Sequence, residues 1–266
     1  MSALTSRPRL AVFGGVYANH LALRATLADI AERGAEHVWC LGDLGGFGPA
    51  PEKSLALLRA SGVRTVQGNY DHSVGHGLAD CACGYADARD ELFAQLAYDY
   101  TAARVGETSR AWLRALPGEA RLTIGRRRVL LCHGSPRRQN EFLWDSTCSD
   151  AFLAWLCDAY AADLIVCSHT GLHWTRTLPG GQQLVNCGAI GRPAHDGNTH
   201  TWYAELAFEP ERVAVSFREV RYDHEALAGE MEQDGLPPEF VATIRTGWWT
   251  TCLGNTPAKE LMAAAR

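Results

Sequence analysis

Short apolar segments alternate with longer amphipathic ones through the first two thirds of the sequence, and this alternation restricts the fold more than any other feature. Short apolar runs are typical of buried strands, whereas leucines that recur at helical spacing, as between Leu21 and Ile30, are typical of helices. Strands separated by helices usually form a largely parallel sheet. The predicted strands of this part are Leu10 to Phe13, His37 to Leu41, Arg64 to Gln67, Arg128 to Cys132 and Leu164 to Cys167.

The pattern changes after Gln183, where short strand-like runs are joined by turns without intervening helices. We predict that these later strands form a second sheet packed on the first: Leu184 to Asn186, Trp202 to Phe208 and Val213 to Arg218. Two helical segments follow, separated by a Gly-Leu-Pro-Pro turn. Because no repeat or low-complexity linker interrupts the chain, we expect one compact α/β domain over residues 1–222, with a helical appendage over 223–266 packed on it.

Each strand of the first group is followed by a turn that carries polar side chains. Asp43, Asn69, His133 and His169 lie in four such turns, and glycines beside them let the backbone turn sharply. Ligands of open α/β sheets bind beyond the carboxyl ends of the strands, so we expect these four side chains to meet. One carboxylate, one amide and two imidazoles predict a divalent cation site, whereas four unrelated capping residues are the competing interpretation.

Charge and hydropathy argue against nucleic-acid and membrane partners. The formal net charge is −5, and the only basic run, Arg126 to Arg128, directly precedes a predicted strand. No stretch approaches the roughly 18 apolar residues that a membrane span requires, and the N-terminus lacks the apolar core of a secretory signal. We therefore expect a cytoplasmic protein.

The nine cysteines are odd in number and irregular in spacing. Cys40, Cys132 and Cys167 lie inside apolar strand-like runs, which favours reduced core residues over a disulfide framework. Cys81-Ala82-Cys83 lacks the spacing of a zinc site, so we interpret this pair as structural.

The order of these turns resembles the motifs of the calcineurin-like metallophosphoesterases, near the bacterial diadenosine-tetraphosphatase-like branch. The resemblance covers about residues 9 to 210 and runs through Gly42-Asp43-Leu44-Gly45, Gly68-Asn69-Tyr70-Asp71, His133-Gly134 and His169-Thr170. It implies a four-layer αββα sandwich of two mixed β-sheets with two metal ions at the strand ends. It also implies that Asp43 is the bridging carboxylate and that Asn69, His133 and His169 complete the second metal site.

The ligands particular to the family's first metal are missing from this sequence. The Asp and His of the first family motif fall on Gly15 and Tyr17, and the final His of the last motif falls on Gly171. We therefore predict a single divalent ion, iron or manganese by preference and zinc as a further option. Rearranged ligands from His20, His173 or Tyr17 are the alternative that would restore a second ion.

A site with one ion must take part of its transition-state stabilisation from side chains. The candidates for catalysis are Tyr17 and Tyr70 as hydroxyl donors and His20 and His72 as acid or base. Arg137 and Arg192, with Arg138 as a further guanidinium, are candidates for binding an anionic substrate. The resemblance adds Asn19, which matches the family's phosphate-contacting Asn, and Asn186, which lies in a turn that closes the site. Core packing for the tyrosines and solvated loops for the arginines are the competing interpretations.

These observations predict a metal-dependent, phosphoesterase-like hydrolase with one metal ion, acting on a phosphate ester or a related anionic small molecule. Two alternatives remain at this stage. Two histidines and one carboxylate are also the ligands of mononuclear non-haem iron enzymes, which suggests an oxygenase or lyase. A non-catalytic binding or regulatory protein could have kept the pocket. The segment Trp248, Trp249 and Cys252 either covers the site or docks the appendage.

Overall fold

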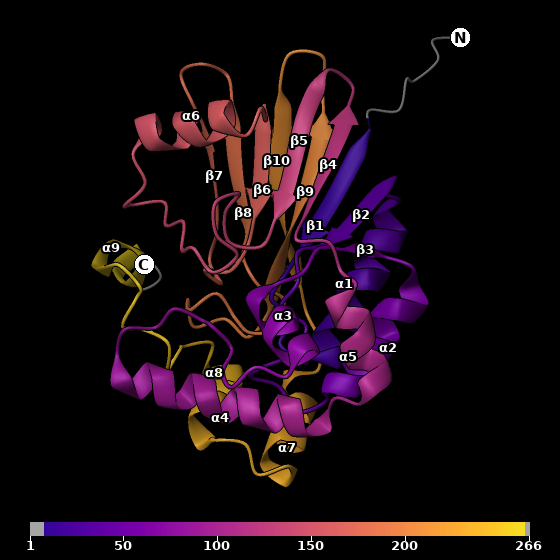
Figure 1. The fold of residues 1–266 in the computed structure, drawn as a ribbon, viewed down its shortest axis with the longest axis vertical. Helices are drawn as coiled ribbons and strands as arrows, with labels where there is room; N and C mark the ends of the chain where they lie inside the picture. Colours follow the sequence, from indigo (N-terminus) through magenta and orange to yellow (C-terminus); the bar gives the residue numbers. More distant parts are fainter. Residues whose placement is uncertain (1–7, 264–266) are drawn as a thin grey trace.

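The computed structural model describes residues 8–263 and contains two five-stranded β-sheets (Figure 1). The first sheet has the order β10-β9-β1-β2-β3, with bounds Val213–Val220, Thr201–Phe208, Arg9–Phe13, His37–Cys40 and Arg64–Thr65. The second sheet has the order β4-β5-β6-β8-β7, with bounds Glu119–Ile124, Arg127–Cys132, Leu164–Cys167, Gln183–Cys187 and His173–Thr177.

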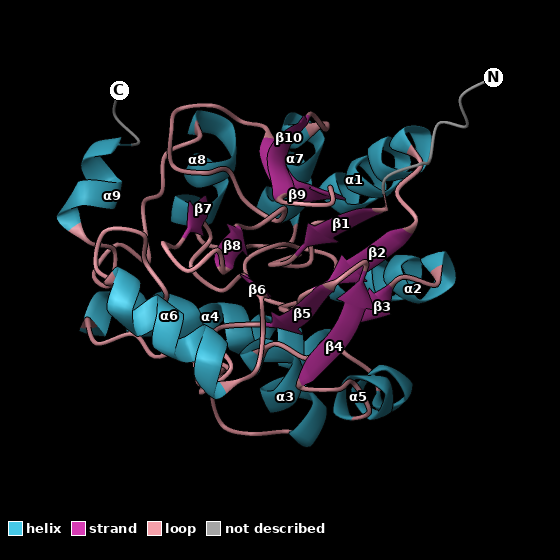
Figure 2. Cartoon of the chain, turned by 90° about the horizontal axis from the view of Figure 1, so that it is seen from above, coloured by secondary structure: helices cyan, strands magenta, loops and turns pink. Residues whose placement is uncertain are grey.

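Helices cover the outer faces of both sheets. Figure 2 shows α1 and α2 beside β1 to β3, and α6 beside the second sheet. The helices that follow the predicted βα pattern are α1 (His20–Arg33), α2 (Pro51–Ser61), α3 (Asn69–His76), α4 (Ala88–Arg104), α5 (Glu107–Arg114) and α6 (Asp150–Ala159). The C-terminal helices are α7 (His224–Gln233), α8 (Pro238–Thr246) and α9 (Ala258–Ala263).

The alternation of side chains along the strands produces four layers. In β1, Leu10 and Val12 point into the core between the sheets, whereas Ala11 and Phe13 pack with α1 on the outside. The side chains of β5 alternate in the same way: Val129 and Leu131 face the first sheet, and Leu130 packs with α6. The order helix, sheet, sheet, helix confirms the predicted αββα sandwich of two mixed sheets.

The central strands of both sheets run parallel. Phe13 of β1 lies opposite Cys40 of β2, and Leu131 of β5 lies opposite Val166 of β6. The antiparallel neighbours β9 and β4 make both sheets mixed. Because parallel strands end at the same edge, the turns after β1, β2, β5 and β6 are positioned to approach one another.

The strands were predicted better than their pairing. All eight predicted strands are present with small shifts at their ends, but the later strands do not make a second sheet by themselves. β9 and β10 join the first sheet, and β5 and β6 belong to the second. The strands β4 and β7 were missed because both are edge strands with exposed polar residues, which weakens the apolar pattern.

The C-terminal helices α7 and α8 pack on α4. Figure 1 shows α4, α7 and α8 together at one end of the molecule, and Phe93 of α4 lies in one cluster with Met231 and Phe240. The boundary predicted at residue 222 falls between β10 and α7, and the division into domain and appendage stays a prediction. Within residues 8–263, no helix combines the length and the apolar character that crossing a bilayer requires.

The cysteine prediction was only partly correct. Cys40, Cys132 and Cys167 are buried free thiols, as expected from their strand positions. Cys81 and Cys83 instead form a disulfide bond across the single residue Ala82. The odd count and irregular spacing gave no sign of a bridge between two such close residues.

Candidate metal centre

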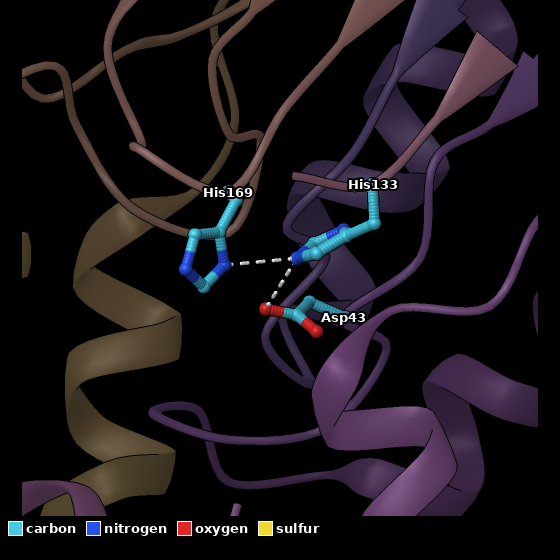
Figure 3. A group of neighbouring side chains, drawn as sticks. All are labelled: Asp43, His133 and His169. Carbon is cyan, nitrogen blue, oxygen red and sulfur yellow. Dashed lines mark hydrogen bonds and ion pairs between the residues drawn. The ribbon is translucent and has the colours of Figure 1, made fainter. Parts of the chain in front are cut away.

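Asp43, His133 and His169 come together from three different turns at one edge of the sheets (Figure 3). Asp43 follows β2, His133 follows β5 and His169 follows β6. The His133 Nε2 atom lies 3.1 Å from Asp43 Oδ2 and 3.1 Å from His169 Nδ1. The three ligand atoms lie within 4.8 Å of one another, and all three side chains are buried. The structure thus joins three of the four predicted metal ligands.

The backbone around Asp43 is held in a conformation that few residues adopt. Asp43 has a φ of 55°, and its own N–H donates to Asp71 Oδ2 at 2.9 Å. Asp71 also accepts the N–H groups of Leu44 at 2.9 Å and of Gly68 at 2.8 Å. The Tyr70 N–H donates to Asp43 Oδ1 at 3.1 Å, so Oδ2 is left for His133. Asp71, which was not among the predicted site residues, therefore positions Asp43.

Gly68 explains why a glycine precedes Asn69. A Cβ at Gly68 would lie 2.5 Å from the Asp43 nitrogen and would also meet its carboxylate. Real Cβ atoms do not approach so closely, so any other residue would displace the metal-site carboxylate. The Gly-Asp and Gly-Asn motifs of the sequence therefore describe one packed unit rather than two independent turns.

The hydrogen bonds of His133 indicate that the site is built for a cation. His133 Nδ1 lies 2.5 Å from the Leu41 carbonyl oxygen, which can only accept, so Nδ1 carries a hydrogen. In the neutral ring, Nε2 then presents a lone pair to a carboxylate oxygen and to a second imidazole nitrogen. These three atoms can converge only with a metal ion, a further proton on His133 or a hydrogen on His169 Nδ1 between them, and a metal ion satisfies all three at once.

Asn69 carries an additional acceptor with no partner. Its Nδ2 donates to the Cys81 carbonyl oxygen at 2.9 Å, whereas its Oδ1 is buried and has no hydrogen-bond partner among the described residues. Leaving a buried acceptor unsatisfied costs about 1–3 kcal/mol. A cation would satisfy this oxygen, and the role of Asn69 as fourth ligand stays a prediction.

The electrostatics favour ligand-ready protonation states for His169 and Asp43. For His133, burial lowers the pKa but the Asp43 charge outweighs it, so the net pKa is raised and metal binding there must release a proton. Burial, followed by the charge of His133, lowers the pKa of His169 to about 3, so this ring is neutral at neutral pH. Burial by itself raises the pKa of Asp43, but His133 outweighs it and the net pKa is below the usual value. Burial and the Asp43 charge raise the pKa of Asp71 to about 7. Neutral imidazole and ionised carboxylate are the forms that bind metals.

A narrow cavity of about 50 Å³ opens beside these residues. Asp43, His169, Tyr17 and Arg192 form its polar part. Its apolar part comes from the loop before α2, from α4 and from α8, through Phe47, Phe93, Ala97 and Phe240. Cys252 of the C-terminal segment also lines it, and so do Cys83 and Tyr85. The cavity therefore has a charged side at the candidate metal centre and an aromatic side away from it.

Among the predicted catalytic residues, the two tyrosines line the cavity and the two histidines do not. Burial raises the pKa of both Tyr17 and Tyr70, so both hydroxyls stay protonated and can donate. The Tyr70 hydroxyl donates to the Ala94 carbonyl at 3.3 Å. His20 Nε2 lies 3.5 Å from Glu230 of α7, because His20 is the first residue of α1 and faces that helix.

His72 is on the far side of α3. Its Nδ1 lies 3.3 Å from Gln67 Oε1, and its ring packs on His76 at 4.4 Å between centroids. His173, considered as a rescuing ligand, lies in β7 with its ring 4.4 Å from that of Phe217. Neither histidine lines the cavity or belongs to the ligand group.

Among the predicted substrate-binding residues, only Arg192 lines the cavity. Asn19 is the N-cap of α1 and is fully buried, with Oδ1 accepting from the Ala22 N–H at 2.9 Å. Asn186 is equally buried and holds the Gly188 turn through its Oδ1 at 2.9 Å. Arg137 pairs with Glu141, and its Nε lies 3.1 Å from Glu141 Oε2. Their side chains support turns and a surface ion pair, and a contact with substrate would require them to leave these partners.

The two glycines that replace expected ligands are tightly enclosed. A Cβ at Gly15 would lie 2.9 Å from Tyr17 Cζ and 2.7 Å from Ala189 Cβ. A Cβ at Gly171 would lie 3.0 Å from Trp249 Cη2 and 3.1 Å from Arg192 Nη2. Both glycines have positive φ, which disfavours side chains independently of the available space. The role of Trp249 was missed as a site feature, although the tryptophan-rich tail had suggested a cover.

Comparison with known proteins agrees with this architecture. The family model for the calcineurin-like phosphoesterase superfamily domain matches residues 9–209. The chain belongs to this superfamily, whose structural relatives include metallophosphoesterases. The resemblance inferred from the turn motifs is therefore confirmed at the level of the family, whereas the missing first-metal ligands stay a prediction.

Individual relatives cover nearly the whole chain. A metallophosphoesterase from Sphaerobacter thermophilus is similar over 91% of this chain and 100% of its own, with 25% identity and a TM-score of 0.68. A hypothetical protein from Pyrococcus horikoshii OT3 covers 91% of this chain and 99% of its own, with 22% identity and a TM-score of 0.73, and shows the same fold. An uncharacterized protein of Methanocaldococcus jannaschii is 24% identical over 86% of this chain and 93% of its own.

Proposed function

We propose that this protein hydrolyses the phosphate ester of a small molecule with a single metal ion held by Asp43, His133, His169 and Asn69. The observation that carries the proposal is the geometry of His133, whose Nε2 faces both a carboxylate oxygen and an imidazole nitrogen at 3.1 Å while its Nδ1 donates to Leu41. Membership of the calcineurin-like phosphoesterase superfamily supports phosphate-ester hydrolysis as the reaction class.

The residues around the site suit this chemistry. A bound divalent ion supplies positive charge to the phosphoryl oxygens and lowers the pKa of a water molecule. Tyr17 has a protonated hydroxyl beside the candidate metal centre and can donate a hydrogen bond to a phosphate oxygen. Phe47, Phe93 and Phe240 exclude water from the other side of the cavity. Because the cavity measures about 50 Å³, the buried part of the substrate must be a small group.

Iron or manganese is the proposed metal, with zinc as a further candidate. Two nitrogen and one or two oxygen donors suit all three ions, and the borderline character of imidazole disfavours magnesium and calcium. Metal analysis of protein purified without added ions should give about one ion per chain. Two ions per chain would contradict the single-metal site, and none would contradict the cation assignment.

The activity test compares the wild type with Asp43→Asn. The wild type should hydrolyse a generic aryl phosphate monoester, and Asp43→Asn should lose metal and at least about 100-fold in rate, because the carboxylate charge that holds the ion is gone. Asp99→Asn removes a carboxylate from the exposed face of α4 and is the matched control. Equal activity of Asp43→Asn and Asp99→Asn would refute the proposed site.

The donor set also favours one second candidate, a non-hydrolytic mononuclear iron or manganese enzyme. Two histidines and one carboxylate in a buried group are the ligands used for such chemistry. Bound iron, oxygen consumption and no hydrolysis of phosphate esters would support this candidate over the first. Hydrolysis without oxygen consumption would exclude it.

A further inference from the structure

Arg192 is a buried cation without an acidic partner. Arg192 is only 6% exposed, and its Nε has no hydrogen-bond partner within residues 8–263. The same part of the chain contains no ion pair between Arg192 and a carboxylate, whereas the partly buried Arg176 and Arg218 each have one. An isolated buried charge is strongly unfavourable unless another charge compensates it. The fold therefore keeps a charge that its own side chains leave uncompensated.

Aromatic packing fixes the guanidinium in the wall of the cavity. Its Cζ lies 3.7 Å from the centroid of the Trp249 ring and 5.7 Å from that of Tyr17. Arg192 lines the same cavity as Asp43 and His169. Such stacking orients the planar group but does not neutralise it. The guanidinium is thus preorganised: Cys252 shares a hydrogen bond with it, and its Nε has no partner among the described residues and is available to a ligand.

Arg192 lies beside Gly171, one of the positions where the family's first-metal ligands are missing. A Cβ on Gly171 would meet Arg192 Nη2 at 3.1 Å and Trp249 at 3.0 Å, so the guanidinium and the indole fill the space beside this glycine. Tyr17 fills the space beside Gly15 in the same way. Among the described residues, only the group of Asp43, His133 and His169 brings together enough His, Cys or carboxylate ligands to hold an ion.

We propose that the Arg192 guanidinium is the second positive charge of this site, and that it binds the phosphate group of the substrate jointly with the single metal ion. A planar guanidinium matches two phosphate oxygens at once, which suits an anion held from one side by a metal and from the other by a fixed fork. The inference rests on the proposed function for its ligand, a phosphate monoester. It assigns to a side chain the charge that a second ion would otherwise provide.

The test measures binding of inorganic phosphate to the metal-loaded protein by isothermal titration calorimetry. Arg192→Gln should weaken phosphate binding about 10- to 100-fold, because a charge-assisted hydrogen-bond pair is lost. The metal content should stay at that of the wild type, because Arg192 is not a ligand. Arg192→Lys keeps the positive charge but loses the planar pair of N–H donors, so its affinity for phosphate should lie between those of the wild type and Arg192→Gln.

Arg104→Gln is the matched control. The Arg104 guanidinium also lies 3.7 Å from an aromatic centroid, that of Tyr100, but it does not line the cavity. This variant should bind phosphate as the wild type does. A circular-dichroism melt of each variant shows that it is folded, and Arg192→Lys serves in its place if Arg192→Gln does not fold.

Two results would overturn the inference. Phosphate affinity of folded Arg192→Gln or Arg192→Lys equal to that of the wild type would remove Arg192 from the anion site. A second equivalent of metal in the wild type would show that an ion, not Arg192, supplies the second charge. Because the assay measures binding without turnover, it separates this inference from the proposed reaction: lost hydrolysis with intact phosphate binding would contradict only the proposed function.

Discussion

Truncating Trp249 to alanine tests whether the C-terminal segment is an integral wall of the site. Trp249 is 4% exposed, and its indole Nε1 donates to the Pro193 carbonyl at 2.7 Å. The centroid of its ring also lies 3.7 Å from Arg192 Cζ. Removing a buried tryptophan costs about 3–5 kcal/mol. Within that range, the indole hydrogen bond accounts for about 1 kcal/mol and the desolvated cation–π contact for about 2 kcal/mol.

This loss should fall mainly on the segment around residues 247–256. Apart from the Trp249 ring, hydrogen bonds hold the segment. The Cys252 and Gly254 N–H groups donate to Asp90 at 2.5 and 2.7 Å, and the Thr250 carbonyl accepts from Arg89 at 2.8 Å. The Thr250 hydroxyl donates to the Glu239 carbonyl at 2.6 Å, and the Asn255 amide donates to the Gly84 carbonyl at 2.8 Å. We therefore expect local opening before global unfolding. Hydrogen–deuterium exchange followed by mass spectrometry measures it directly, as faster exchange in peptides that cover this segment.

The neighbouring Trp248 provides the control. Trp248 is 38% exposed and contacts the His195 ring edge at 5.1 Å between centroids, so Trp248→Ala should cost only about 1 kcal/mol. Phosphate binding should weaken in Trp249→Ala and stay unchanged in Trp248→Ala, because the Trp249 ring packs on Arg192 at 3.7 Å and no such contact is formed by Trp248 among the described residues. Equal exchange rates and equal phosphate affinities in the two variants would refute the assigned role of the tail.

Three further predictions concern the metal centre. Gly68→Ala should lower the metal content measured by atomic emission, because the added Cβ would displace Asp43. Gly118→Ala is the control and should leave the metal content unchanged, because its Cβ would meet nothing within 4 Å. Equal metal contents in the two variants would contradict the close packing of Gly68 on Asp43. Asp71→Asn should lower the free energy of unfolding in urea by about 2–3 kcal/mol, because one amide oxygen cannot accept all three backbone N–H groups and the remaining donor is left buried; a midpoint equal to that of the wild type would contradict this. Chelation should lower the melting temperature, since an ion at about 100 times its dissociation constant stabilises the folded state by about 2.7 kcal/mol, and an unchanged melt would argue against a metal bound to the native fold.

The sequence predicted those features that depend on local patterns. Strand positions follow from short apolar runs, and the ligand turns follow from polar residues placed next to glycines, so Asp43, His133 and His169 could be identified together. The assignment of strands to sheets could not be predicted in the same way. β9 and β5 have similar apolar patterns, and only tertiary packing decides that β9 pairs with β1.

Two predicted site residues that do not line the cavity lie in a turn where a polar side chain has two uses. An Asn at position 19 could contact a phosphate or cap a helix, and in the structure Asn19 caps α1. His20 follows it directly, but the first turn of α1 points its ring toward Glu230. The sequence left open whether the C-terminal segment covers the site or docks the appendage, and local patterns could not place Cys252 in the cavity wall, because the cavity joins residues that are far apart in sequence.

The charges of the proposed site predict that an anion completes it. The two histidine ligands and Asn69 are neutral when bound to a metal, and Asp43 contributes one negative charge. A divalent ion and Arg192 together would leave a net charge of about +2, or about +1 if the ion lowers the pKa of Asp71 enough to ionise it. A phosphate monoester carries about −1.5 to −2 charges at neutral pH. The substrate would therefore neutralise a buried site that the protein alone leaves positive, whereas a neutral compound of the same size would leave Arg192 uncompensated and should bind weakly.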